Sequence, residues 1–149
     1  MTWTARTSGS TAILRDVVYA GSQFVAVGEG GVILTSTDGI TWTRVNTGRT
    51  VDLFQVVNAN RINVFVAISR NGTMLYSSNG TTWTAVTVPG LPTGATFSDL
   101  TWDGSEFLLV VNDNTQKPRI YVSGDGAAWA ASSTTYSSGF FNGVVAGNG

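Results

Sequence analysis

The chain of 149 residues contains no cysteine and no histidine. The lack of cysteine excludes disulfide bonds and thiolate metal sites, and the lack of histidine removes the commonest metal ligand, general base and neutral-pH switch. Charged residues make up only 11% of the chain, with eight Lys and Arg against nine Asp and Glu. Because nucleic-acid binding requires clustered basic residues that neutralise phosphates, we expect no nucleic-acid partner.

Long apolar segments are also missing. The sequence has no run of 18 apolar residues, and its start, MTWTARTSGS, lacks the apolar stretch of a secretion signal. We therefore expect no membrane insertion, and a virion or the cytoplasm is the favoured location. A hydrophobic content of 42% is enough for the core of one folded domain.

A short phrase occurs three times along the chain. It reads STDGITW at 36–42, SSNGTTW at 77–83 and SGDGAAW at 123–129, and a partial copy, TWT, stands at 2–4. Asp-Gly and Asn-Gly pairs favour tight turns between antiparallel strands. The chain is therefore a repeat protein with a period of about 40 residues.

Each repeat contains four short β-forming runs separated by turn residues. The predicted strands are Leu14–Ala20, Gln23–Gly28, Val32–Ser36 and Thr41–Asn46; Leu53–Asn58, Val64–Ser69, Thr73–Ser77 and Thr82–Thr87; and Phe97–Trp102, Phe107–Asn112, Arg119–Ser123 and Ala128–Ser132. Four antiparallel strands recurring at this period are typical of β-propeller blades. We predict a single all-β domain with three complete blades, at about 13–46, 53–87 and 97–132.

The repeat begins and ends out of phase. Residues 2–6 match only the last strand of a blade, and residues 140–146 match only a first strand. Three blades do not close a propeller ring, and an open ring exposes apolar sheet faces. We expect another chain to complete the ring, in a homo-oligomer with a dimer favoured or in a larger assembly, unless these residues are part of a longer protein.

The repeated phrase resembles the Asp-box, Ser-x-Asp-x-Gly-x-x-Trp, of BNR-type repeats in sialidase-like propellers and in the photosystem II assembly and stability factor family. It is shortened here by one residue between the acid and the Trp. The matching residues are Ser36, Asp38, Gly39 and Trp42; Ser77, Gly80 and Trp83; and Ser123, Asp125, Gly126 and Trp129, and in the middle copy Asn79 replaces the Asp. The resemblance implies a propeller fold in which the box has a structural role.

The residues themselves point to the same role. Asp38, Asn79 and Asp125 are of the type that binds backbone amides in tight turns. The Trp residues recur at one position of the last strand, which indicates packing between blades.

Candidate catalytic groups do not converge. A sialidase-like site needs three arginines, a Tyr with a Glu partner and an Asp, but the arginines fall at unrelated repeat positions and the only glutamates are Glu29 and Glu106. We expect no enzyme activity, no catalytic residue, no metal site and no cofactor.

The expected binding face is one rim of the propeller. In an up-and-down blade, the turns between second and third strands share a rim with the links to the next blade, and nearly all loop variation falls there. Binding commonly uses variable loops on a rigid scaffold. The candidate binding residues are Glu29, Arg49, Arg70, Asn114, Lys117 and Tyr136.

Three functions remain open at this point. The leading hypothesis is a non-enzymatic binding or assembly module, such as a phage virion or tail accessory protein or a surface-binding protein. The alternative is a glycan-binding or glycan-processing propeller fragment, with a glycan as partner. A weaker alternative is an assembly factor for a membrane complex.

Overall fold

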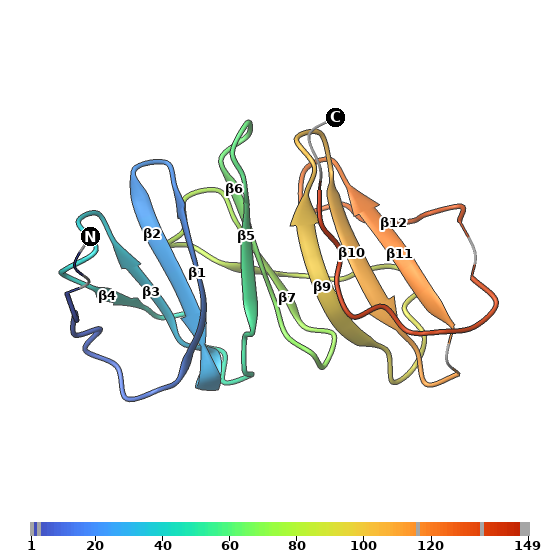
Figure 1. The fold of residues 1–149 in the computed structure, drawn as a ribbon, viewed down its shortest axis with the longest axis horizontal. Coiled ribbons are helices and arrows are strands. Elements are labelled where there is room, and N and C mark those ends of the chain that lie inside the picture. Colours follow the sequence, from blue (N-terminus) through green and yellow to red (C-terminus); the bar gives the residue numbers. More distant parts are fainter. Residues whose placement is uncertain (1, 3, 116, 135, 147–149) are drawn as a thin grey trace.

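The computed structural model describes residues 2, 4–115, 117–134 and 136–146, and it contains three four-stranded antiparallel sheets (Figure 1). Each sheet is one blade, with its strands side by side in chain order. The strands are β1 (Leu14–Ala20), β2 (Gln23–Gly28), β3 (Ile33–Ser36) and β4 (Thr43–Val45) in blade 1; β5 (Gln55–Ala59), β6 (Val64–Ile68), β7 (Met74–Ser77) and β8 (Thr84–Val86) in blade 2; and β9 (Thr96–Trp102), β10 (Phe107–Asn112), β11 (Pro118–Ser123) and β12 (Ala130–Ala131) in blade 3. One turn of 3-10 helix, η1 (Glu29–Gly31), joins β2 to β3.

Tight turns and apolar runs explain why these segments form hairpins. Between β1 and β2, Gly21 and Ser22 both have positive φ, at 58° and 66°, as a two-residue hairpin turn requires. The β6 strand, VFVAI, is buried at every position, as expected of a strand with a neighbouring blade on each side. The predicted strand order and hairpin connections are therefore confirmed.

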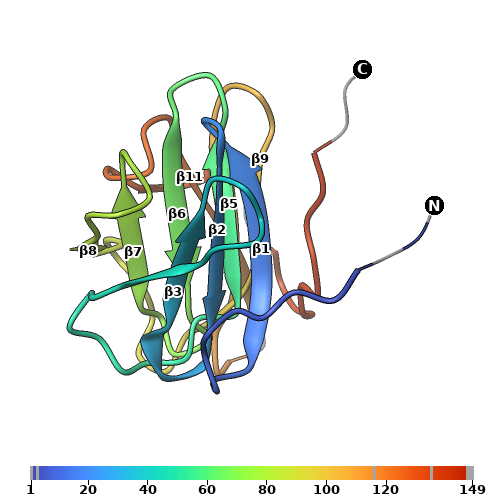
Figure 2. The same cartoon turned by 90° about the vertical axis from the view of Figure 1, so that its left-hand side faces the viewer.

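The blades stack face to face and are arranged as an open arc. The first strands lie together along one edge, with β1 against β5 and β5 against β9, while β4 and β8 lie at the opposite edge of their sheets (Figures 1 and 2). The turns from first to second strands share one rim, and the turns from second to third strands share the other (Figure 1). The described residues do not close into a ring.

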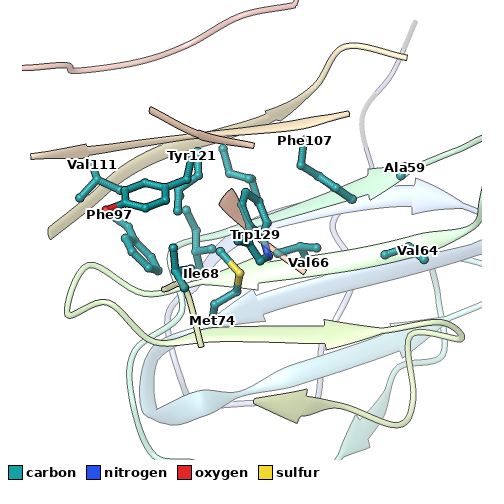
Figure 3. Packing of buried hydrophobic residues seen from close by; sticks show 13 residues of the cluster. Ala59, Val64, Val66, Ile68, Met74, Phe97, Phe107, Val111, Tyr121 and Trp129 are labelled. Atoms are coloured by element: carbon teal, nitrogen blue, oxygen red, sulfur yellow. The ribbon is translucent and has the colours of Figure 1, made fainter. Parts of the chain in front are cut away.

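The hydrophobic core lies between the blades. We call the side of a blade that faces the preceding blade its first face, and the other side its second face. Val25, Val27 and Ile33 on the second face of blade 1 pack against Phe65 and Ala67 on the first face of blade 2. A larger cluster joins blades 2 and 3 and includes Val66, Met74, Phe97, Phe107, Tyr121 and Trp129 (Figure 3). A single four-stranded sheet cannot bury either of its own faces, so each blade depends on its neighbours to remove its apolar residues from water.

The outermost strands are shorter than the sequence predicts. The strand β4 begins at Thr43 rather than Thr41, because the Thr41 backbone N–H donates to Asp38 Oδ1 at 2.7 Å. The corresponding amides of Thr82 and Ala128 donate to Asn79 and Asp125, each at 2.8 Å. Residues predicted to open each last strand therefore belong to the turn before it.

The prediction of lone terminal strands needs correction. Residues 4–6 and 140–146 have no strand assignment, and Met1 and Trp3 lie outside the described residues. A strand is defined by a paired neighbour. The part of the chain that the structure describes supplies no second strand beside either segment. Residues 140–146 nevertheless occupy the position of a first strand, as the contacts of Phe141 and Val144 below show.

Candidate functional site

The three turn phrases share the same hydrogen bonds between their Ser, their Asp or Asn and the following backbone amides. In the first, the Ser36 hydroxyl accepts from the Gly39 N–H at 2.9 Å and donates to Asp38 Oδ1, which also accepts from Ile40 N–H at 2.7 Å. Gly39 has a φ of 69°, a conformation that favours glycine. In the other two copies, the indole Nε1 of the Trp donates to the Gly carbonyl, from Trp83 at 2.9 Å and from Trp129 at 3.0 Å. These are the bonds of a structural turn.

The same bonds fix the ionisation of the turn carboxylates. The amides of Thr41 and Ile40, followed by the Ser36 hydroxyl, lower the pKa of Asp38 to about 2. The amides of Ala128 and Ala127 lower the pKa of Asp125. A carboxylate held ionised in this way is a poor proton donor near neutral pH.

The predicted binding residues lie in separate places on the rim. Glu29 pairs with Arg15, and the guanidinium of Arg70 lies 4.6 Å from the centre of the Phe54 ring. Arg15 and Arg70 line a groove of about 550 Å³ between blades 1 and 2, together with Asp52. Of the six predicted residues, Arg70 therefore lines this groove, and Glu29 is linked to it through Arg15.

The other four predicted residues do not join this groove. Lys117 and Tyr136 line a second groove, of about 390 Å³, beside β11 and β12. Asn114 lies near Gly94, and the backbone N–H of Arg49 donates to the hydroxyl of Thr47, two residues earlier, at 3.2 Å. The six residues thus do not form one site.

A further cavity lies on the opposite rim, where the sequence pattern predicts only uniform turns. It measures about 410 Å³ and is lined by the first strands, including Tyr19, Asn58, Asn60 and Trp102. Within the described residues, Asn58 Oδ1 and Trp102 Nε1 are buried without a hydrogen-bond partner. Tyr19, Asn58 and Trp102 hold the same position in the three repeats. The change of residue type at this position of the first strand is the sequence signal that could have indicated the cavity.

Side chains of the first strands also tie each blade to the next. Val56 N–H donates to Asp16 Oδ2 at 2.9 Å, and Leu100 N–H donates to Gln55 Oε1 at 2.9 Å. Asp16, Gln55 and Asp99 occupy one repeat position, directly before the donor position of their own strand. A polar residue at that position in every repeat is the sequence signal that could have indicated these bonds between blades.

The segment 140–146 continues this series. Val144 N–H donates to Asp99 Oδ2 at 2.8 Å, as Val56 does to Asp16. Phe141 N–H donates to Asn112 Oδ1 at 2.8 Å. At the preceding boundary, Phe97 N–H of blade 3 donates to the carbonyl of Arg70, which holds the same position in blade 2 as Asn112 holds in blade 3. Residues 141–144 are therefore bonded to blade 3 as a following blade would be.

The first face of blade 1 has no blade against it in the structure. Val17 is 55% exposed there, whereas its counterpart Val56 on blade 2 is 3% exposed. Six apolar residues are identical between the two first faces: Leu14, Val17, Phe24, Ala26, Leu34 and Trp42 on blade 1, and Leu53, Val56, Phe65, Ala67, Leu75 and Trp83 on blade 2. On blade 1, Ala26 and Leu34 are already buried, in a cluster that Ala12 packs against. Blade 1 thus carries an interblade surface that lacks its neighbour.

No group of three or more acidic residues in the described part of the chain is placed to hold a metal ion. No helix in the described ranges is long and apolar enough to cross a membrane.

Comparison with known proteins agrees with this architecture. No curated protein matches the chain significantly. A family model described as the DUF6242 beta propeller domain matches residues 1–146, and with the three stacked blades this shows that the chain belongs to the DUF6242 β-propeller domain family.

Proposed function

We propose that this domain is a non-enzymatic assembly module whose arc of blades is completed by another polypeptide. The observation that carries the proposal lies on the first face of blade 1, where Leu14 and Val17 are exposed although their counterparts on blade 2 are buried against blade 1. Apolar surface that is buried at one blade boundary gains free energy by being buried at another, at about 25 cal/mol per Å². An accessory protein of a larger particle, such as a virion, is one setting that fits this role.

The absence of catalysis is part of the proposal. The sequence supplies no histidine or cysteine, and the turn carboxylates Asp38 and Asp125 are occupied by their own backbone amides. A sialoside hydrolysis assay tests this part, and turnover by the purified protein would contradict it.

The turn geometry supports a related proposal, that the repeat is a shortened Asp-box of the BNR type. In all three copies the Ser hydroxyl and the Asp or Asn side chain close the turn together. Urea denaturation of Asp38→Ala tests it, and a variant as stable as the wild type would contradict it.

Sedimentation velocity over a range of concentrations tests the assembly function. The wild-type chain is expected to form a species larger than the monomer, and Val17→Asp is expected to abolish it by placing a charge on the open face. Ile62→Asp is the matched control, because Ile62 is 45% exposed in the turn before β6, away from that face. Equal assembly by wild type and Val17→Asp would refute the proposal.

Glycan binding is a second candidate, favoured by the cavity that contains Tyr19 and Trp102. Aromatic rings beside the amides of Asn58 and Asn60 offer a stacking surface with hydrogen-bonding groups, which suits a sugar. A glycan array tests it. Tyr19→Ala should remove binding, whereas Tyr136→Ala, on the opposite rim, should not.

A further inference from the structure

We propose that residues 140–146 stand in for strand β1 of a second copy of this chain and are displaced when that copy docks its blade 1 onto blade 3. The inference rests on the assembly function proposed above and names its partner, a second copy. It also makes the segment, here called the tail, a regulator of that assembly.

The first argument is the match between the tail and β1. At the boundary between blades 1 and 2, Leu53 N–H donates to the carbonyl of Gly28 and Val56 N–H donates to Asp16. On blade 3, Val144 of the tail takes the place of Val56 and donates to Asp99, while Phe141 takes the place of Leu53 but donates to the side chain of Asn112 instead of a backbone carbonyl. In a second copy, Leu14 and Val17 hold these repeat positions, so the tail and an incoming β1 compete for Asp99.

The second argument is that the tail covers the second face of blade 3 incompletely. On that face Val110 is buried, but Leu108 and Ile120 are only half-buried. The tail itself leaves Val145 89% exposed and Phe140 59% exposed, although both are large and apolar. The 390 Å³ groove remains open between Ile120 on β11 and Tyr136 in the segment before the tail. A single segment leaves this space because a complete blade has three further strands.

The third argument is that the two open faces correspond to a pair that already fits. The first face of blade 1 has the apolar residues of blade 2, and blade 2 packs on Val25, Val27 and Ile33 of blade 1. The corresponding residues of blade 3 are Leu108, Val110 and Ile120, which are also branched and apolar. An incoming blade 1 would therefore meet, on blade 3, an apolar surface like the one that blade 2 contacts on blade 1.

The geometry of a pair follows from this interface. Blade 3 of each copy would receive blade 1 of the other, which uses both open faces and leaves none exposed. An interface between two different surfaces of the same chain produces a closed ring when the rotation between neighbouring copies brings the last copy back to the first. Two copies then form a closed ring of about six blades, within the range known for propellers.

The tail also cannot extend the series of interblade bonds. Asp16, Gln55 and Asp99 present an acceptor to the next blade, but Gly143 holds that position in the tail and has no side chain. A blade placed after the tail would lack the bond that every described boundary has. This favours displacement of the tail over a ring in which it is retained.

The test uses two proline substitutions in this chain. Val144→Pro removes the N–H that donates to Asp99, whereas Val145→Pro changes a neighbouring, exposed Val whose side chain is largely in water. Dimer dissociation constants are measured by sedimentation equilibrium for wild type and both variants. If the tail competes, Val144→Pro tightens the dimer about tenfold, the effect of one lost hydrogen bond, and Val145→Pro leaves it unchanged.

The other outcomes separate this inference from the proposed function. A weaker dimer in Val144→Pro, or an unchanged one, would show that the tail does not compete and would overturn the inference. If the wild type still dimerises and Val17→Asp does not, the assembly function stands without it. A monomer at every concentration for all variants would overturn both.

Discussion

Val56 donates its backbone N–H to Oδ2 of Asp16 across the boundary between blades 1 and 2, over a distance of 2.9 Å. Because Val56 is only 3% exposed, its amide has no ready replacement partner in water. Asp16→Ala is therefore expected to cost about 1–3 kcal/mol of unfolding free energy, the usual cost of a buried polar group left unpaired.

Urea denaturation measures this cost, and Asp16→Asn is the matched control. The Asn side chain retains an acceptor oxygen of nearly the same shape, so it should preserve most of the stability. Equal losses in Asp16→Ala and Asp16→Asn would show that the hydrogen bond to Val56 is not the cause.

The turn carboxylates make stability sensitive to acid. The folded protein lowers the pKa of Asp38 to about 2 from 3.8, so the ionised form favours folding. This contribution is complete well above the unfolded pKa and is lost as the pH falls through the folded pKa. Asp38→Asn, which keeps the acceptor without the titration, should reduce the loss of thermal stability between about pH 4 and pH 2.

In the middle repeat, the opposite substitution, from Asn to Asp, tests the same effect. Asn79 makes the same bonds to Thr81 and Thr82 without a charge. Asn79→Asp should therefore increase the acid sensitivity of the melting temperature. Identical pH profiles for wild type, Asp38→Asn and Asn79→Asp would contradict this account.

The sequence predicted the blades but not the details of their contacts. The turn phrase and its period revealed the strands to within a few residues, because hairpin turns and alternating apolar residues are local signals. The pairing of Val56 with Asp16, by contrast, joins residues of two repeats, and no local pattern contains it. The rim residues were also only partly predicted: variable loops indicated Arg70 and Glu29, but the distance between Arg49 and the grooves depends on how the blades stack.

Gly126 occupies a position where both the backbone and the packing require glycine. Its φ is 76°, and a Cβ there would lie 2.8 Å from Val66 Cγ2 and 3.1 Å from the Phe107 ring. Gly126→Ala should lose about 1–2 kcal/mol from the left-handed backbone and about 1–3 kcal/mol more from overpacking.

Gly48→Ala is the control for this substitution. Gly48 has a φ of 65°, but a Cβ there would meet no other part of the protein within 4 Å, so only the backbone cost applies. Chemical denaturation of both variants measures the difference. A loss in Gly126→Ala no larger than that in Gly48→Ala would show that blade 2 yields to the added methyl group.

Two equivalent tryptophans should differ in their importance to the monomer. Trp129 is 6% exposed within the cluster between blades 2 and 3, while Trp42 lies half-buried at the open first face of blade 1. Trp129→Ala should cost about 3–5 kcal/mol, and Trp42→Ala clearly less. Denaturation at concentrations below assembly measures both.

For assembly, the effects of the two Trp substitutions should be in the opposite order. Trp42→Ala is expected to weaken dimerisation, since the ring belongs to the face that a second copy would cover. Two variants with equal monomer stability and equal assembly would contradict the assignment of Trp42 to that face.

The brevity of the last strands has a consequence for the outer circumference of the molecule. β4 and β8 have three residues each and β12 has two, since the turn phrase uses the amides that precede them. A passing polypeptide would find few free backbone groups there to pair with, which is how sheet proteins resist edge-to-edge aggregation. The short outer strands therefore protect the molecule from strand-to-strand association into fibres, whether or not its sheet faces bind another chain.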